Sequence, residues 1–260
     1  MSSPVLSVCA TSFNCADAVR EHIDSVWKSL GGISFEYVIV DNRSSDGTME
    51  ILLELERSHE GLAVLSRRCS RGRGRQVAAE HASADTLLVV DVDTIYGPPL
   101  RSLVWRYLEE FRARRLALQG IYAGLYPRDL WFEVGGMRDL NFAEDFDLWM
   151  RLWEHGFMRW TPVVLGENRK LPSEQDGRDV LSRRYAPPTR VLRLFRRELD
   201  FWRLRRYSRL DLVEIWRANA VDLGLGEMRT RWFGEQPAWS LAGMLRRVRA
   251  DLRAIFGDGR

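Results

Sequence analysis

The first half of the chain predicts an α/β protein with an open, mostly parallel sheet flanked by helices. Short apolar runs alternate there with amphipathic stretches, and parallel strands need such crossover segments, which are usually helices. The apolar runs cover residues 5–10, 35–40, 62–65 and 86–90, and helical periodicity covers 16–30, 46–58 and 74–84. In open sheets of this kind, ligands bind at the carboxyl ends of the strands.

The second half breaks this regular alternation. We expect a helix over 99–114, a short strand over 116–119, an irregular stretch over 120–127, and a helix over 143–154 that ends before Gly156. Residues 166–188 are polar and rich in proline, which predicts a connecting or lid-like segment. Amphipathic helices follow over 189–206, 210–223 and 238–256. The predicted parts are therefore a catalytic domain (1–165), a connecting segment (166–188) and an Arg-rich helical extension (189–260).

Charge is distributed unevenly along the 260 residues. Residues 178–260 contain 19 arginines, no lysine and 10 acidic residues, a net charge of +9, whereas residues 1–177 carry −6. With 45% hydrophobic and 29% charged residues, the composition is that of a globular protein. No apolar run approaches the roughly 18 residues of a membrane span, and the first residues lack a signal-peptide pattern. Together with three cysteines in no metal-binding spacing, this predicts a cytoplasmic protein.

Asp91 and Asp93 follow the apolar run 86–90 directly. Side chains at i and i+2 of an extended segment point the same way, so both carboxylates can face one cleft at the end of the sheet. Paired carboxylates are hard oxygen ligands that suit Mn²⁺ or Mg²⁺, and such an ion binds a substrate diphosphate. A solvated turn at the end of a strand is the alternative interpretation.

A second acidic pair, Glu144 and Asp145, opens the helix predicted over 143–154. A Gly135–Gly136 turn precedes it, and a tryptophan-rich apolar face follows. Acidic residues in the first turn of a helix also complement the helix dipole, which is the structural explanation. The combination of a glycine turn, an acidic pair and a buried helix favours a catalytic role.

Two further segments carry polar groups at the expected edge of the sheet. Asp41 ends the run 35–40, where a carboxylate can accept hydrogen bonds from a nucleobase, although turn chemistry also explains the residues after it. The sequence RGRGR (71–75) opens the third helix, where guanidinium groups and glycine amides favour a bound phosphate. An exposed basic loop is the alternative.

These four segments, in this order, resemble the family-two nucleotide-sugar glycosyltransferases. The matching sequences are VLSVCATSFN, VIVDNRSSDGT, RGRGRQVAAEHASADTLLVVDVD and GGMRDLNFAEDFDLW, which together fall within about residues 4–165. The resemblance implies the GT-A fold and an inverting transfer of a sugar from a nucleoside-diphosphate donor to a hydroxyl acceptor. An asparagine after Asp41 and the arginine-rich segment 71–75 depart from the usual pattern and obscure which base and sugar are bound.

The resemblance also implies roles for single residues. Asp145 would be the catalytic base, and Glu144 would position it or contact the acceptor. The metal, Mn²⁺ or Mg²⁺, would be bound by Asp93, with Asp91 at the ribose or in the metal shell. The remaining donor-binding residues would be Thr11 and Phe13 at the nucleoside, Asp41 at the base and Arg73 at the base or diphosphate.

Two other functions remain open on the sequence. A sugar nucleotidyltransferase uses a related sheet, but it has a glycine-rich phosphate loop after the first strand, where this chain has ATSFNCADAV. A non-enzymatic binder of nucleic acid or of an anionic surface would use the basic C-terminus and leave the acidic pairs without a role. We therefore expect a transferase that binds no nucleic acid.

The C-terminal helices suggest where such a transferase works. In 189–206 and 238–256, apolar stripes lie beside clusters of arginine, a pattern typical of helices that lie on an anionic membrane. Packing of these stripes on the catalytic domain is the commoner alternative. The membrane hypothesis predicts peripheral attachment at the inner face of the membrane and a lipid-linked acceptor.

Overall fold

The computed structural model describes residues 3–169, 192, 218–221 and 223. All of these except Leu192 belong to one compact unit of the chain. The predicted helices 189–206 and 238–256 and most of 210–223 lie outside the described residues, as does most of the predicted connecting segment. Within the described part, no helix has the length and apolar character that crossing a membrane requires.

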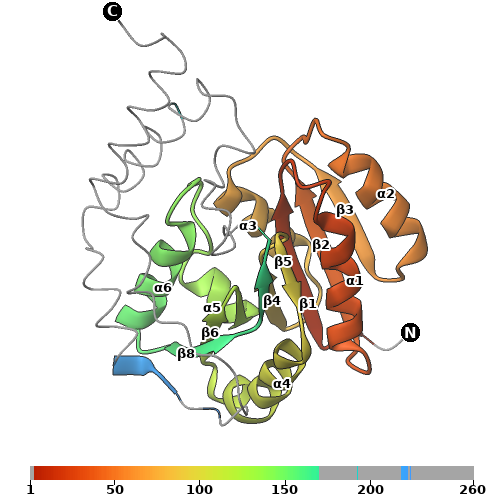
Figure 1. Ribbon diagram of the computed structural model, residues 1–260. Helices are drawn as coiled ribbons and strands as arrows, with labels where there is room; N and C mark the ends of the chain where they lie inside the picture. Colours follow the sequence, from red (N-terminus) through yellow and green to blue (C-terminus); the bar gives the residue numbers. More distant parts are fainter. Residues whose placement is uncertain (1–2, 170–191, 193–217, 222, 224–260) are drawn as a thin grey trace, which may run out of the picture. The chain divides into compact units, whose positions relative to one another are not determined.

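A seven-stranded sheet forms the centre of this unit (Figure 1). Its spatial order is β3-β2-β1-β4-β7-β6-β8, and β7 is the strand that runs against the others. The predicted mostly parallel open sheet is confirmed. The strands are β1 (Leu6–Ser12), β2 (Phe35–Asp41), β3 (Leu62–Ser66), β4 (Thr86–Val90), β6 (Ala117–Ile121), β7 (Ala123–Pro127) and β8 (Met158–Val164).

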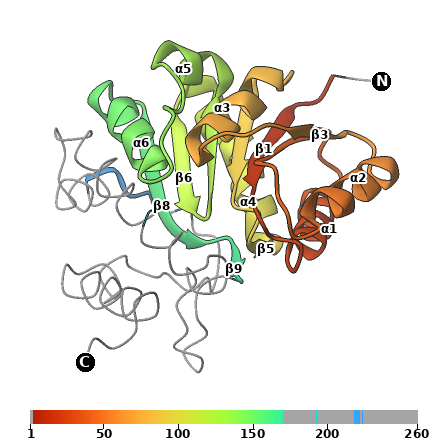
Figure 2. The same cartoon turned by 90° about the horizontal axis from the view of Figure 1, so that it is seen from above.

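Helices cover both faces of the sheet, as Figure 2 shows from above. One face packs against α1 (Val19–Leu30), α2 (Thr48–Ser58) and α4 (Pro98–Arg106), and the other against α3 (Arg71–His81), α5 (Arg128–Glu133) and α6 (Glu144–Glu154). Helix α4 continues through a π-helical turn, η1 (Tyr107–Phe111), and a 3₁₀ turn, η2 (Arg112–Arg114). The helix expected over 99–114 therefore changes its hydrogen-bond pattern twice before it ends.

The buried strand β4 illustrates why both faces need cover. Leu88 and Val90 belong to the core beneath α1 and α4, whereas Leu87 and Val89 belong to the core beneath α3 and α5. Because successive side chains of a strand point to opposite faces, a continuous apolar run makes two cores at once. The apolar run 86–90 was therefore a reliable strand signal.

Several elements were not expected from the sequence. The stretch 120–127 was predicted to be irregular because Gly124 and Pro127 are residues that often interrupt strands. The structure has strand β7 in this stretch. A side chain at position 124 would collide with Gln119 and Tyr126, so the glycine permits close packing inside the sheet. The other unpredicted elements are α5, β8, and a separate two-stranded sheet of β5 (Thr94–Tyr96) and β9 (Gly166–Asn168).

Strand β9 changes the expected boundary of the catalytic part. A connecting segment was predicted to begin at residue 166, but Gly166 pairs with Tyr96 and Asn168 pairs with Thr94. The sequence of β9, GEN, is polar, and its residues are half-buried or exposed. Residues 166–169 therefore belong with the sheet edge that carries Asp91 and Asp93.

Candidate active site

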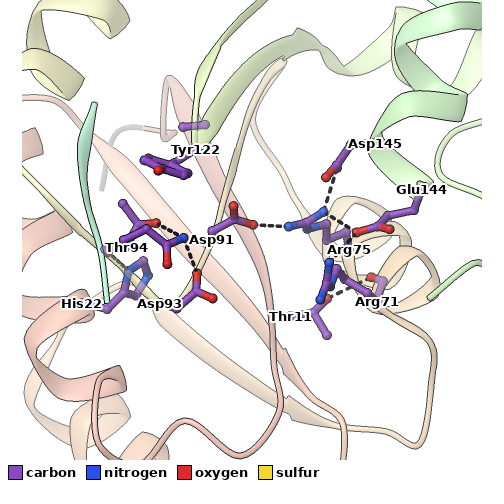
Figure 3. A network of polar contacts seen from close by, with 12 residues as sticks. Thr11, His22, Arg71, Arg75, Asp91, Asp93, Thr94, Tyr122, Glu144 and Asp145 are labelled. Carbon is purple, nitrogen blue, oxygen red and sulfur yellow. Dashed lines mark hydrogen bonds and ion pairs between the residues drawn. The ribbon is translucent and has the colours of Figure 1, made fainter. Parts of the chain in front are cut away.

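The segment after β4 is a tight turn. Strand β4 ends at Val90, and the amide of Thr94 donates a hydrogen bond to the carbonyl of Asp91 at 3.1 Å. The expectation that Asp91 and Asp93 lie along one extended segment is therefore wrong. Figure 3 shows the Asp91 carboxylate directed toward Arg75, whereas Asp93 lies on the side of Thr94. The two carboxylates are neighbours because the chain turns between them.

Strand β5 and helix α1 hold this turn in place. The amide of Asp91 donates to the Tyr96 hydroxyl at 3.1 Å, and that hydroxyl donates to the Tyr122 carbonyl at 2.6 Å. On the other side, His22 Nδ1 lies 2.8 Å from the Thr94 carbonyl, so this nitrogen carries the proton. Its Nε2 then accepts the hydroxyl of the buried Tyr37 at 2.7 Å. These bonds fix the backbone at both ends of the acidic turn.

Asp93 is enclosed by the β5–β9 ribbon. The residue is 8% exposed, and its backbone carbonyl accepts the amide of Arg169 at 2.7 Å. The side-chain amide of Asn168 lies 3.4 Å from Asp93 Oδ1. Residues some 75 positions apart thus meet at the predicted metal ligand, which no local pattern in the sequence indicated.

Arg75 is the central group of the site (Figure 3). Its side chain is 5% exposed and contacts three carboxylates. Nη1 lies 2.7 Å from Asp145 Oδ1 and 3.0 Å from Glu144 Oε1, and Nη2 bonds to Asp91 Oδ1. One turn earlier on α3, Arg71 Nη1 lies 3.5 Å from Glu144 Oε1. The acidic pair of α6 and the turn after β4 are therefore joined through one guanidinium group.

Glu144 and Asp145 differ sharply in exposure. The Glu144 side chain is 2% exposed and the Asp145 side chain is 34% exposed. Glu144 is buried and its Oε1 contacts Arg75 and Arg71, and its two expected roles, positioning Asp145 or contacting the acceptor, stay predictions. Asp145 contacts Arg75 through Oδ1 and also reaches solvent. Of the pair, Asp145 is the group that a second substrate can meet.

The acidic groups of the site also influence one another's protonation. Burial raises the pKa of Asp91 to about 6, against the opposing effect of Arg75 and with a further increase from the charge of Asp93. Burial likewise raises the pKa of Asp145, again opposed by Arg75 and reinforced by Glu144. Both carboxyl groups therefore hold a proton more readily than an aspartate in water.

The loop before α6 is fixed from α3. Gly135 and Gly136 have φ values of 86° and 60°, in the left-handed region that glycine adopts without strain. Gln76 Oε1 accepts hydrogen bonds from the Trp131 indole at 2.8 Å and from the Met137 amide at 2.9 Å. The predicted glycine turn is thus present, and Gln76 determines its position relative to Arg75.

The glycines of the RGRGR segment have a packing role. The amide of Gly72 donates to the Leu140 carbonyl at 2.9 Å, and the amide of Gly74 donates to the Ser70 carbonyl at 2.9 Å. The amide of Arg73 donates to the Ser70 hydroxyl at 3.0 Å. These three amides are already bonded within the protein, so the expected phosphate cradle of glycine amides is not present.

The same glycines bring α3 close to its neighbours. A Cβ at Gly72 would lie 3.0 Å from the Glu144 Cβ and would collide with the Arg138 carbonyl. A Cβ at Gly74 would collide with the side chain of Thr11. Without side chains at these two positions, α3 can approach β1 and α6 closely enough for Arg75 to reach the acidic pair.

Arg73 points elsewhere. Its guanidinium contacts Glu80 on the same helix, with Nη1–Oε1 at 2.8 Å and Nη2–Oε2 at 3.3 Å. It takes no part in the carboxylate network of Arg75. The sequence singled out Arg73 and not Arg75, although Arg71 and Arg75 are four residues apart and therefore share one face of the helix. That spacing was the signal available to find Arg75.

Asp41 is fully buried at the end of β2. Its carboxylate accepts the Ser12 hydroxyl at 2.9 Å, the Ser44 hydroxyl at 2.6 Å and the Ser44 amide at 2.8 Å. These bonds tie the ends of β1 and β2 together. The contact of Asp41 with a nucleobase stays a prediction. It requires the base to reach a carboxylate that is enclosed in this structure.

Thr11 and Phe13 lie at the carboxyl end of β1, beside Asp41 and α3. Thr11 and Phe13 are half-buried, and the Thr11 hydroxyl donates to the Arg71 carbonyl at 3.3 Å. The structure therefore brings Thr11, Phe13 and the acidic turn to one edge of the sheet, where ligands of open α/β sheets bind.

The oxygen donors of the acidic turn suit a hard divalent cation. Mg²⁺ and similar ions commonly bind through one or two carboxylates together with waters and substrate phosphates. Asp91 and Asp93 supply two such carboxylates, and Asp91 also bonds to Arg75. Among the described residues, no group of three or more His, Cys, Asp or Glu side chains could hold a metal.

A family model matches most of this unit. Residues 7–158 match the model described as glycosyl transferase family 2, and this match covers more than half of the chain. The chain belongs to glycosyl transferase family 2. The matched residues include most of β1, all of β2 to β4, the acidic turn, Arg75 and the acidic pair of α6. The resemblance found in the four sequence segments is confirmed.

Solved structures of low sequence identity share the fold. A mannosyltransferase from Pyrobaculum calidifontis, in complex with GDP-Man and Mn²⁺, is 16% identical with a TM-score of 0.58, and the alignment covers 100% of this chain and 77% of that one. S. aureus TarS 1–349 is 19% identical with a TM-score of 0.51 over 60% of this chain. The family 2 chain spans 57% of that TarS chain, under two thirds of its length. The GT-A fold is therefore confirmed.

Proposed function

We propose that this family 2 protein is an inverting glycosyltransferase that moves a sugar from a nucleoside-diphosphate donor to a hydroxyl acceptor. The observation that carries the proposal is the connection of Asp145 through Arg75 to Asp91. Asp145 is the more exposed carboxylate of the acidic pair, and Asp91 begins the turn at the sheet edge where a donor would bind. In this proposal, a group that can receive a proton would lie beside the bound diphosphate.

The transfer requires one bond to form and one to break at the anomeric carbon. The acceptor hydroxyl oxygen attacks from the face opposite the diphosphate, the bond from the anomeric carbon to the diphosphate oxygen breaks, and the nucleoside diphosphate leaves with that electron pair. The hydroxyl proton passes to the Asp145 carboxylate. A positioned base of this kind contributes about 10²–10⁴-fold to the rate. Attack from the opposite face inverts the anomeric configuration.

Asp93, with Asp91 in its shell, would hold Mn²⁺ or Mg²⁺. Such an ion neutralises negative charge on the departing diphosphate. On the donor side, Thr11 and Phe13 would line the nucleoside pocket, Asp41 would contact the base, and Arg73 would have to leave Glu80 to reach the base or diphosphate. A similar structure of TarS 1–349 in complex with UDP-GlcNAc, with a TM-score of 0.53, supports a nucleotide-sugar donor.

A panel of nucleotide sugars with Mn²⁺ or Mg²⁺ tests the proposal. We expect at least one donor to raise the unfolding temperature in the presence of metal and to release its nucleoside diphosphate when an acceptor is added. The product should have the anomeric configuration opposite to that of the donor. Release of pyrophosphate from a nucleoside triphosphate and a sugar phosphate would instead identify a nucleotidyltransferase.

The acceptor is a separate proposal, which rests on the basic C-terminal sequence. A lipid-linked acceptor would require the protein to sit at an anionic membrane, where each arginine contributes about 1 kcal/mol. We expect the full chain to sediment with anionic vesicles at low salt, and less at high salt because the attraction is screened. A chain that ends at residue 184 is the control. If the full chain does not bind anionic vesicles at low salt, a soluble hydroxyl acceptor is favoured. Salt-dependent binding to oligonucleotides without turnover would favour the non-enzymatic alternative.

A further inference from the structure

We propose that Arg75 is a positioning residue that holds the catalytic base Asp145 in register with the donor-side turn. This inference rests on the proposed function, since it assigns how the base is oriented within that reaction. Arg75 lies on α3, whereas its partners lie on two other elements of the unit. Nη2 reaches Asp91 after β4, and Nη1 reaches Asp145 at the start of α6.

The shape of the guanidinium group makes this connection possible. Its two terminal nitrogens lie in one plane and point to different carboxylates, which a single ammonium group cannot do in the same way. Among the described residues, Nε of Arg75 has no hydrogen-bond partner, so these contacts are made by Nη1 and Nη2. With 5% of the side chain exposed, water does not compete strongly for either nitrogen.

Arg75 also determines which oxygen of the base faces the acceptor. Asp145 Oδ1 accepts from Nη1 at 2.7 Å, which leaves Oδ2 as the oxygen that can receive a proton. Glu144 Oε1, at 3.0 Å from the same Nη1, prevents the guanidinium from following Asp145 if that side chain moves. Arg71 supports Glu144 from the preceding turn of α3. The base is therefore held by an arginine that is itself fixed on two other sides.

Arg75→Lys tests this role. The lysine keeps one positive charge and loses the fork, so the base should be misplaced while the charge balance remains. A displacement of about 1 Å at a reacting group can cost roughly 100-fold. We expect kcat per folded molecule to fall by about that factor, and the Kd of the nucleoside diphosphate to change by less than about threefold. Arg151→Lys is the matched control: Arg151 is also largely buried, and it binds Asp147 and the carbonyls of Val134 and Gly136, none of which has a proposed role in the reaction.

A double-mutant cycle with Asp145→Asn identifies the partner through which Arg75 acts. If Arg75 works by orienting Asp145, adding Arg75→Lys to Asp145→Asn should lower kcat by less than about threefold further, because groups that act as a unit are not additive. Two full, additive losses would overturn the proposal, as would a weaker Kd with unchanged kcat, which would make Arg75 a donor-binding residue. Arg75→Lys could also lose only as much activity as Arg151→Lys, with the loss disappearing when the rate is expressed per folded molecule. The role of Arg75 would then be structural, which would also overturn the proposal. Inactivity of the unmodified protein with every donor would instead count against the proposed function itself.

Discussion

Replacing each member of the acidic pair by its amide should separate the two roles that burial assigns to them. Glu144→Gln removes the charge from a 2%-exposed group that contacts Arg75 at 3.0 Å and Arg71 at 3.5 Å. A hydrogen bond to a charged group contributes about 1.5–3 kcal/mol to the free energy of unfolding. In a domain of this size about 1 kcal/mol corresponds to roughly 2–4 °C, so Tm should fall by about 3–12 °C.

Asp145→Asn should behave in the opposite way. Its side chain is 34% exposed, so solvent screens its contact with Arg75 and the loss of stability should stay below about 1 kcal/mol. Loss of the general base should lower kcat by about two to four orders of magnitude, roughly 2.7–5.5 kcal/mol in activation free energy. Donor binding should hardly change.

The measurements are thermal unfolding of both variants and release of nucleoside diphosphate during transfer, with the rate expressed per folded molecule. A Glu144→Gln protein that is inactive at unchanged Tm, beside an active Asp145→Asn protein, would refute the assignment from burial. In that case the buried carboxylate would be the base, and the exposed one would have only a supporting role.

Three further outcomes are expected. Asp93→Asn keeps the volume of a side chain on a residue that is 8% exposed but removes its charge. Mn²⁺ binding, measured by titration, and metal-dependent turnover should therefore both be lost. Full turnover in the presence of a chelator would disprove the metal assignment. Asp41→Asn should weaken binding of the nucleoside diphosphate by about 1.5–3 kcal/mol, and an unchanged Kd in calorimetry would exclude the base contact. Because a protonated carboxyl group cannot accept a proton, kcat should decline as the pH is lowered through the pKa of Asp145. Burial raises that pKa above the ordinary value of 3.8, so the decline should begin at a higher pH than for an exposed aspartate and disappear in Asp145→Asn.

The sequence by itself determined the class of fold and the edge of the sheet that carries the site. Apolar runs such as 86–90, and the spacing of apolar residues in helices, involve only a few neighbouring residues, so strands, helices and their alternation can be found locally. Asp41 and Asp91 were placed correctly because each comes at the end of a predicted strand. The acidic pair could be assigned to the first turn of a helix because helical periodicity is also a local pattern.

The tertiary structure alone decided how these residues work together. Arg75 and Asp145 are 70 positions apart, and whether they meet depends on how closely α3 approaches α6, which Gly72 permits. Glu144 and Asp145 differ in burial, and the sequence alone does not show which of two adjacent acidic residues is buried. Contacts between distant elements depend on packing in three dimensions, whereas the periodicity that reveals each element is a property of its own few residues.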